Sequence, residues 1–112
     1  MAFAPFDIVV VPFPYADRLA EKRRPAVVVS APALERRHGL VWLAMVTSAS
    51  NPAWRGDVVI GDLKSAGLPA PSRIRPAKLA TVDAARIVRR IGKLDAGDRS
   101  SLRTSLKALA AW

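Results

Sequence analysis

The chain has 112 residues, 51% of them hydrophobic, which suits one folded domain with a modest core and is too short for two. Its 18 Lys and Arg against 9 Asp and Glu leave a net charge of +9, so the expected partner is polyanionic: nucleic acid, an anionic membrane surface or an acidic protein. The absence of cysteine excludes disulfides and thiolate metal sites and fits a reducing cytoplasm. We therefore expect residues 1–112 to form a single basic domain.

The sequence does not predict a membrane location. No segment approaches the roughly 20 apolar residues that a membrane-spanning helix needs. The first residues, Met1–Pro5, lack the basic region and the long apolar run of a signal peptide. We expect a cytoplasmic protein that does not associate with membranes.

Two apolar runs near the start of the chain are separated by a charged segment. Phe6–Pro14 and Ala26–Ser30 are short and rich in β-branched residues, which favours a pair of strands. The intervening Tyr15–Arg24 is too long for a tight hairpin turn, and loops of that length are often functional. Pro25 restricts Arg24 to an extended backbone, which would hold its guanidinium at the start of the second strand. A solvated cationic turn is the alternative.

The middle of the chain alternates apolar runs with polar connections. The expected elements are a polar connection at 31–39, a central strand at 40–46, a hydroxyl-rich loop at 47–52, a strand at 57–60, a loop at 61–71, a strand at 72–76, a short helical turn at 81–86 and a last strand at 87–94. Because strands and helices do not alternate, a small antiparallel barrel or coiled sheet is favoured over a doubly wound fold.

The C-terminal segment has helical periodicity. Asp95 is a suitable N-cap, and Asp98 in the first turn complements the helix dipole. An apolar stripe at helical spacing should pack on the sheet: Leu102, Leu106 and Leu109. A basic stripe beside it is most simply a solvated face, with a groove for phosphates or an acidic partner as the alternative: Arg99, Arg103 and Lys107. The predicted fold is mainly β (α+β), with one C-terminal helix.

The residues that most catalytic mechanisms require are missing. His38 is the single histidine, and Ser48 and Ser50 have no base partner for a catalytic triad. The acidic residues lack the spacing of a metal site, and no phosphate-cradling glycine motif occurs. We therefore expect no metal ion and no cofactor.

A set of cations and hydroxyls remains: Arg24, Thr47, Ser48 and Arg75. Such groups suit binding of a phosphodiester and neutralising the charge that builds up when it is attacked. RNA supplies its own nucleophile, the 2′-hydroxyl, so its cleavage needs neither a metal nor a serine. Aromatic rings are candidates for stacking on RNA bases, although such rings more often serve a core or an interface: Phe13, Tyr15 and Trp54.

Over nearly its whole length, the chain resembles the MazF/PemK-type toxins of bacterial toxin–antitoxin pairs. The segments similar to that family are Asp7–Pro14, Lys22–Ser30 with its arginine–proline pair, Val46–Ser48, Gly56–Ile60, Ser72–Arg75 and Leu79–Asp83. Each segment is short, but their order and spacing across about a hundred residues make the resemblance specific.

The resemblance implies an SH3-like antiparallel β-barrel with a C-terminal α-helix, assembled as a homodimer. It implies a metal-independent endoribonuclease that cuts single-stranded RNA, such as mRNA, at short sequences and leaves a 2′,3′-cyclic phosphate and a 5′-hydroxyl. It also implies a cognate antitoxin with an acidic segment that covers the RNA site. By position, the catalytic residues would be Arg24, Thr47 and Arg75. The expected substrate-binding residues are Lys22, Arg23, Ser48, Lys78, Phe13 and Tyr15.

Three residues depart from the family pattern. Phe6 stands where the family often has glycine, Ala77 where some members carry a catalytic aspartate, and Ala80 where many carry arginine. The loss of the acid removes a candidate base, and the loss of the arginine removes a contact to RNA or within the fold. Either the mechanism rests on Arg24 and Thr47, or the activity is reduced.

Two other functions are compatible with the same residues. One is a toxin of the same fold that acts by binding a protein, as the gyrase-poisoning relatives do. The other is a non-catalytic basic barrel that binds nucleic acid. The arginine–proline pair and the Thr47–Ser48 pair favour the nuclease, because a protein-binding toxin has no need of them.

Overall fold

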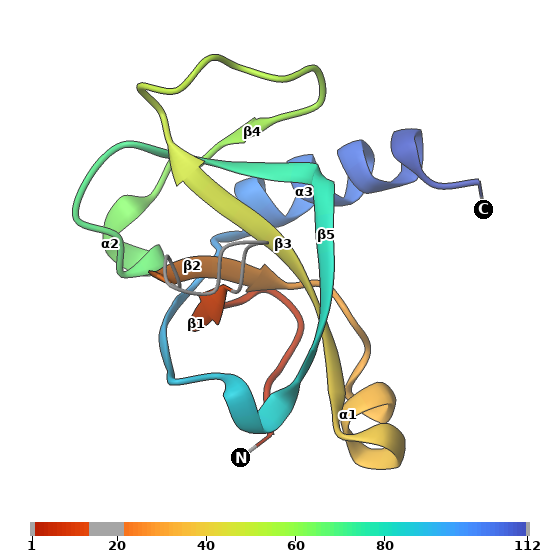
Figure 1. Cartoon of the computed structure of the whole chain (residues 1–112). Helices are drawn as coiled ribbons and strands as arrows, with labels where there is room; N and C mark the ends of the chain where they lie inside the picture. Colours follow the sequence, from red (N-terminus) through yellow and green to blue (C-terminus); the bar gives the residue numbers. More distant parts are fainter. Residues whose placement is uncertain (1, 14–21, 112) are drawn as a thin grey trace.

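Six antiparallel strands build one curled sheet in the computed structural model, which describes residues 2–13 and 22–111 (Figure 1). The order across the sheet is β4-β5-β3-β2-β1-β6. The strands are β1 (Asp7–Phe13), β2 (Lys22–Val28), β3 (Leu40–Ser48), β4 (Val58–Val59), β5 (Ser72–Asp83) and β6 (Arg89–Lys93). The helices are α1 (Pro32–His38), α2 (Leu63–Ala66), the short 3-10 helix η2 (Ala84–Arg86) and α3 (Ala96–Leu109).

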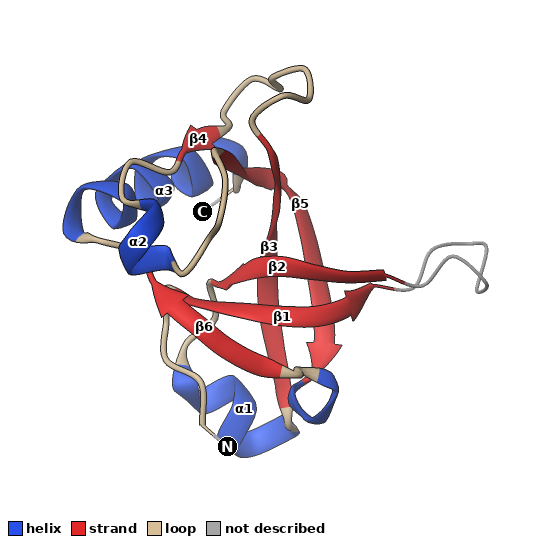
Figure 2. Ribbon diagram, turned by 90° about the vertical axis from the view of Figure 1, so that its left-hand side faces the viewer, coloured by secondary structure: helices blue, strands red, loops and turns tan. Residues whose placement is uncertain are grey.

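The sheet curls because its two halves run in different directions. In Figure 2, β1, β2 and β6 cross in front of β3 and β5, and α3 lies at one end of the molecule with α1 at the other. The result is a half-barrel with a C-terminal helix. The prediction of a mainly β, small antiparallel barrel fold with one C-terminal α-helix is confirmed.

Strand periodicity divides the interior into two clusters. Neighbouring residues on a strand point to opposite faces, so Val27 belongs to one cluster while Ala26 and Val28 belong to the other. The first cluster includes Leu102 of α3, which is fully buried. Burying a leucine side chain contributes about 2 kcal/mol, so this contact anchors α3 on the sheet.

The start of α3 agrees with the prediction, and its last turn does not. The Asp95 carboxylate accepts a hydrogen bond from the backbone N–H of Asp98 at 2.8 Å, as an N-cap does. Leu109 was predicted to complete the apolar stripe, but its side chain is 51% exposed, because the helix runs past the edge of the sheet. In the basic stripe, Arg99 donates to the carbonyl of Leu94, and the Arg103 guanidinium lies 4.7 Å from the Phe6 ring centroid.

Two of the predicted connections contain short helices. Residues 31–39 include α1, and residues 61–71 include α2. The carboxylate of Asp62, the N-cap of α2, accepts a hydrogen bond from the backbone N–H of Ser65. Helices of this length are marginal on their own. In α1, the Glu35 carboxylate accepts a hydrogen bond from the backbone of Phe3, so a distant segment stabilises it.

Several strand boundaries also differ from the prediction. The predicted loop at 15–24 is shorter, because its last residues, Lys22–Arg24, belong to β2. Residues 14–21, which include the end of the first predicted strand and most of that loop, lie outside the described residues. Residues 47–48 extend β3. The predicted strands at 57–60 and 87–94 shorten to β4 and β6, whereas β5 continues through Pro76 to Asp83 and replaces half of the helical turn expected at 81–86.

Phe6 has a left-handed backbone with φ of +70°. Such a conformation costs a non-glycine residue about 1–2 kcal/mol, which accounts for the glycine often present here in the family that the sequence resembles. The Phe6 side chain packs against the cluster that contains Leu102, which offsets part of this strain. Of the helices described, none has the length and apolar composition required to cross a bilayer.

Candidate active site

The ends of β2 and β3 bring Arg24 and Thr47 to the same face of the sheet. Ala26 of β2 faces Met45 of β3 in the antiparallel register. Arg24 lies two residues before Ala26 and Thr47 two residues after Met45, so both side chains keep the orientation of that pair. Both residues line one small hollow of about 50 Å³. The two residues singled out from the sequence therefore face a common space.

A bulge in β5 completes this hollow. Ala44 pairs with Leu79 and the next residue, Met45, pairs with Arg75, so the β5 residues between them have no partner in β3. Pro76, the first residue of the bulge, lacks a backbone N–H and is fully buried. As a result, Arg75 and Lys78 both line the hollow beside Arg24 and Thr47.

A second hollow of about 460 Å³ adjoins the first, because both are lined by Arg24, Val46 and Thr47. Its remaining walls come from β2, from the end of β3 with the turn after it, and from the segment that leads into the start of β5: Lys22, Arg23, Pro25, Ser48, Asn51, Leu68, Pro69, Ala70, Pro71 and Ser72. Lys22, Arg23 and Ser48, which were expected to bind substrate, thus lie around the same space as Arg24. Among the residues that the structure describes, this lining carries cations and hydroxyls and no carboxylate.

The turn after β3 holds Thr47 through its hydroxyl group. The side-chain amide of Asn51 donates a hydrogen bond from Nδ2 to Thr47 Oγ1 at 2.6 Å. Ser48 and Ser50 share a hydrogen bond between their hydroxyl oxygens at 2.8 Å. The backbone N–H of Asn51 donates to the carbonyl of Ser48 and closes the turn.

Arg75 is buried, and its guanidinium is bound to the loop between β3 and β4. It forms an ion pair with Asp57, with 3.0 Å between NH2 and Oδ2, and donates to the carbonyl of Pro52 at 2.9 Å. Its Cζ lies 4.1 Å from the centroid of the Trp54 ring. Arg75 therefore presents positive charge to the hollow while it holds that loop in place.

The pKa of Asp57 is lowered by this contact. Burial raises the pKa of the carboxyl, but the hydrogen bonds from the Arg75 side chain and from the backbone N–H of Trp54, with the positive charge of Arg75, outweigh burial. Asp57 is therefore ionised at neutral pH and acts as the counter-ion of Arg75.

The aromatic candidates lie at different places. The Lys78 ammonium lies 5.9 Å from the centroid of the Phe13 ring, so Phe13 is connected to the hollow through Lys78. Trp54 is 49% exposed beneath Arg75. Tyr15 lies outside the described residues. His38 lies in the last turn of α1 and lines neither hollow, and residues 2–13 and 22–111 contain no group of three His, Cys, Asp or Glu side chains that could hold a metal ion.

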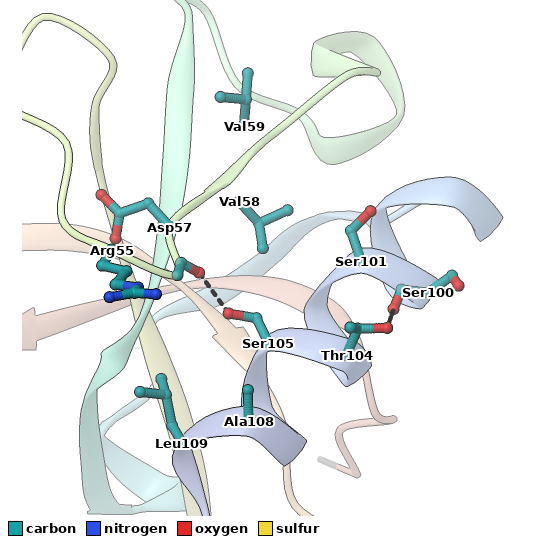
Figure 3. A pocket seen from close by; sticks show the side chains of 11 residues that line it. Arg55, Asp57, Val58, Val59, Ser100, Ser101, Thr104, Ser105, Ala108 and Leu109 are labelled. Carbon is teal, nitrogen blue, oxygen red and sulfur yellow. Dashed lines mark hydrogen bonds between the residues drawn. The ribbon is translucent and has the colours of Figure 1, made fainter.

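A larger hollow of about 890 Å³ lies between α3 and the segment that leads into β4 (Figure 3). Hydroxyl groups line its helical wall, with Ser105 donating to the carbonyl of Gly56 and Thr104 to that of Ser100. Arg55 is its one lining cation among the described residues, and its lining carboxylate, Asp57, is paired with Arg75. This lining lacks the cluster of cations that surrounds Arg24.

Sequence reasoning missed two contributors to the site. The sequence pattern predicts a hydroxyl-rich loop that contains Asn51 but indicates no role for it, although an amide four residues after a hydroxyl in a turn is within hydrogen-bonding reach of it. The sequence pattern predicts that a strand ends at Pro76, where the structure has a bulge. Proline inside an otherwise alternating strand is the signal for such a bulge.

The family model described as PemK-like, MazF-like toxin of type II toxin–antitoxin system matches residues 4–110. A chain of the MazE–MazF crystal structure (Form III) from Deinococcus radiodurans has a TM-score of 0.78 and 20% identity, covering 97% of this chain and 96% of that one. Among curated proteins, none matches in sequence.

Two mycobacterial structures resemble this chain about as closely as the Deinococcus structure does. An endoribonuclease in complex with its cognate antitoxin from a mycobacterial species has a TM-score of 0.77 and 15% identity, covering 96% of this chain and 93% of that one. The Mycobacterium tuberculosis toxin MazF-mt6 has a TM-score of 0.73 and 20% identity, covering 91% and 93%. At these identities the likeness shows a shared fold over almost the whole of each chain.

Proposed function

The chain belongs to the PemK-like, MazF-like toxins of type II toxin–antitoxin systems, and we propose that it acts as a metal-independent endoribonuclease on single-stranded RNA. The enzyme cuts messenger RNA at short sequences and so arrests translation and growth. Support from solved structures comes from fold neighbours described as endoribonucleases.

One observation carries the proposal: Arg24 and Thr47 line the same hollow from two adjacent strands, with Arg75 and Lys78 beside them. A phosphodiester placed there meets a guanidinium, a hydroxyl and further positive charge. Lys22 and Arg23 extend the cationic lining into the adjoining hollow, where neighbouring phosphates of the strand are neutralised.

The reaction is a transesterification within the RNA. The 2′-oxygen attacks the adjacent phosphorus and loses its proton, while the bond from phosphorus to the 5′-oxygen breaks and that oxygen gains a proton. Negative charge builds up on the non-bridging oxygens, where Arg24 stabilises it and Thr47 donates a hydrogen bond. A guanidinium is a poor base because it keeps its proton in proteins, so we assign Arg24 the electrostatic role.

The basic lining also fits an inhibitory partner. The structural neighbours include complexes, of an endoribonuclease with its cognate antitoxin and of MazF with MazE. We propose that an antitoxin with an acidic segment covers the hollows around Arg24 and so competes with RNA, and that the toxin works as a homodimer.

The test is cleavage of single-stranded RNA by the purified protein in EDTA, with analysis of the product ends. The expected products carry a 2′,3′-cyclic phosphate and a 5′-hydroxyl, and Arg24→Ala slows their formation by roughly 1,000-fold. Arg36→Ala, which removes an exposed arginine of α1, is the matched control and retains full activity. If Arg24→Ala stays toxic to cells while RNA remains intact, the toxin acts by binding a protein instead.

A further inference from the structure

We propose that Asn51 is a positioning residue, which fixes the direction in which the Thr47 hydroxyl donates its hydrogen bond. The inference rests on the proposed RNA cleavage and adds a residue that determines its rate. Asn51 would act through Thr47 and have no contact of its own with the reacting phosphate.

The hydrogen-bonding capacity of a hydroxyl group is the basis of the proposal. A threonine hydroxyl has one hydrogen to donate and two lone pairs that accept. Asn51 Nδ2 donates to Thr47 Oγ1 at 2.6 Å, which occupies a lone pair on the side of the turn. The hydrogen of Thr47 is therefore directed away from Asn51. The hollow that Thr47 shares with Arg24 lies next to it, and there the hydrogen can meet a phosphate oxygen.

The turn that carries Asn51 is anchored at several points. The Asn51 backbone donates to the carbonyl of Ser48 at 3.1 Å, and the Ser50 backbone donates to the hydroxyl of Ser48 at 3.2 Å. Residue Ala49 connects the turn to the opposite wall, because its backbone N–H donates to the Pro71 carbonyl and its own carbonyl accepts from Arg73. A donor held in this way can orient its partner without losing much conformational entropy on each turnover.

The expected effect is on catalysis more than on binding. If the Thr47 hydrogen bond strengthens as charge builds on the phosphate, a misdirected hydroxyl lowers kcat and leaves KM nearly unchanged. Loss of one such donor typically reduces kcat about 100-fold. Removal of the orienting amide alone has a smaller effect, because a freely rotating hydroxyl still spends part of its time in the productive direction.

Asn51→Asp is the decisive variant. Aspartate has nearly the same shape but only accepts hydrogen bonds, so the Thr47 hydrogen turns toward residue 51 and away from the phosphate. We expect kcat to fall about 50-fold in Asn51→Asp and about 5-fold in Asn51→Ala. Both losses are smaller than the loss of about 100-fold expected when one transition-state donor is removed altogether. Ala53→Asp places the same charge on an exposed position of the same loop. It should change kcat less than about 2-fold, because an exposed charge is well screened by water.

A double-mutant cycle separates orientation from charge. In a Thr47→Val background there is no hydroxyl to orient, so Asn51→Asp should have less than about a 2-fold further effect on kcat. If Asn51→Asp reduces kcat by the same factor with and without the Thr47 hydroxyl, charge repulsion explains the effect and the proposal is wrong. Full activity of Asn51→Asp would likewise refute it, because the amide would then not be the donor.

Two controls keep the outcomes distinct. Thermal unfolding of each variant identifies those that fail to fold. Among the folded variants, a lower kcat for Asn51→Asp than for Asn51→Ala is the result that a merely structural role of Asn51 does not produce. If the wild-type protein leaves RNA intact, the proposed function fails first and Asn51 has no reaction to support. If the wild type cleaves and Arg24→Ala does not, only the contribution of Asn51 is under test.

Discussion

Two hollows meet at the Arg75–Asp57 ion pair, and they differ in size and in chemistry. Arg75 lines the hollow of about 50 Å³ with Arg24 and Thr47, whereas Asp57 lines the one of about 890 Å³ with hydroxyl groups of α3. The larger space has ample room but little charge, and the smaller one concentrates cations on a narrow surface. Charge and donor placement, and not volume, indicate where a phosphodiester would react.

The largest expected effect compares one arginine from each hollow. Arg24→Ala should reduce the rate of RNA cleavage by roughly 1,000-fold, because it removes the main charge opposed to the developing negative charge. Arg55→Ala removes an exposed arginine from the larger hollow and should leave the rate within about 2-fold, as expected of an exposed charge. Single-turnover cleavage of a short fluorescent RNA measures both. Equal losses in the two variants would contradict the assignment of the site to the smaller hollow.

The next effect compares two threonines. Thr47→Val should lower kcat about 100-fold with little change in KM, because it removes one transition-state hydrogen bond without a change in side-chain shape. Thr104→Val in the larger hollow removes a hydroxyl that donates to the Ser100 carbonyl of its own helix and should leave kcat unchanged. Steady-state kinetics on the same RNA measures the two constants. A large drop in kcat for Thr104→Val would place reacting groups in the larger hollow.

A third prediction concerns the ion pair shared by the two hollows. Asp57→Asn leaves the buried Arg75 guanidinium without its counter-charge and should lower the free energy of unfolding by about 2 kcal/mol at neutral pH. Chemical denaturation measures this loss. An unchanged free energy of unfolding would mean that Asp57 does not stabilise the fold.

The same pair predicts how stability depends on pH. The pKa of Asp57 in the folded protein lies below its ordinary value of 3.8, so the folded state binds fewer protons than the unfolded state in that range. The stabilisation is complete above the ordinary value and is lost as the pH falls through the lower, folded value. Asp57→Asn should remove this part of the acid dependence, which denaturation curves between neutral pH and about pH 3 would reveal.

The smallest effect concerns affinity for RNA. Lys22→Ala should weaken RNA binding about 3-fold at moderate salt and lower the slope of log affinity against log salt by about 0.7, the value for one phosphate contact on a single strand. Lys64→Ala on α2 removes an exposed lysine that lines none of the three hollows and should change neither quantity. Fluorescence anisotropy with a labelled RNA over a salt series is the measurement. Identical slopes for both variants would mean that Lys22 does not contact an RNA phosphate.

The sequence alone determined the features that depend on local backbone chemistry. Short β-branched runs predicted the strands, Pro25 predicted the extended backbone of Arg24, and Asp95 predicted the start of α3. Each of these follows from steric restriction or from a hydrogen bond within a few residues. Arg24 and Thr47 could also be named as site candidates, because a basic chain without histidine pairs or metal ligands leaves few groups able to act on a phosphodiester.

Only the tertiary structure decided how these residues meet. The bulge at Pro76, the ion pair of Arg75 with Asp57 and the contact of Asn51 with Thr47 depend on strand register and on loops that pack together after folding. The exposure of Leu109 was likewise settled by where the sheet ends, which helical spacing does not contain. Local patterns specify the elements, whereas the distances between side chains far apart in the sequence arise when the sheet curls and brings its edges together.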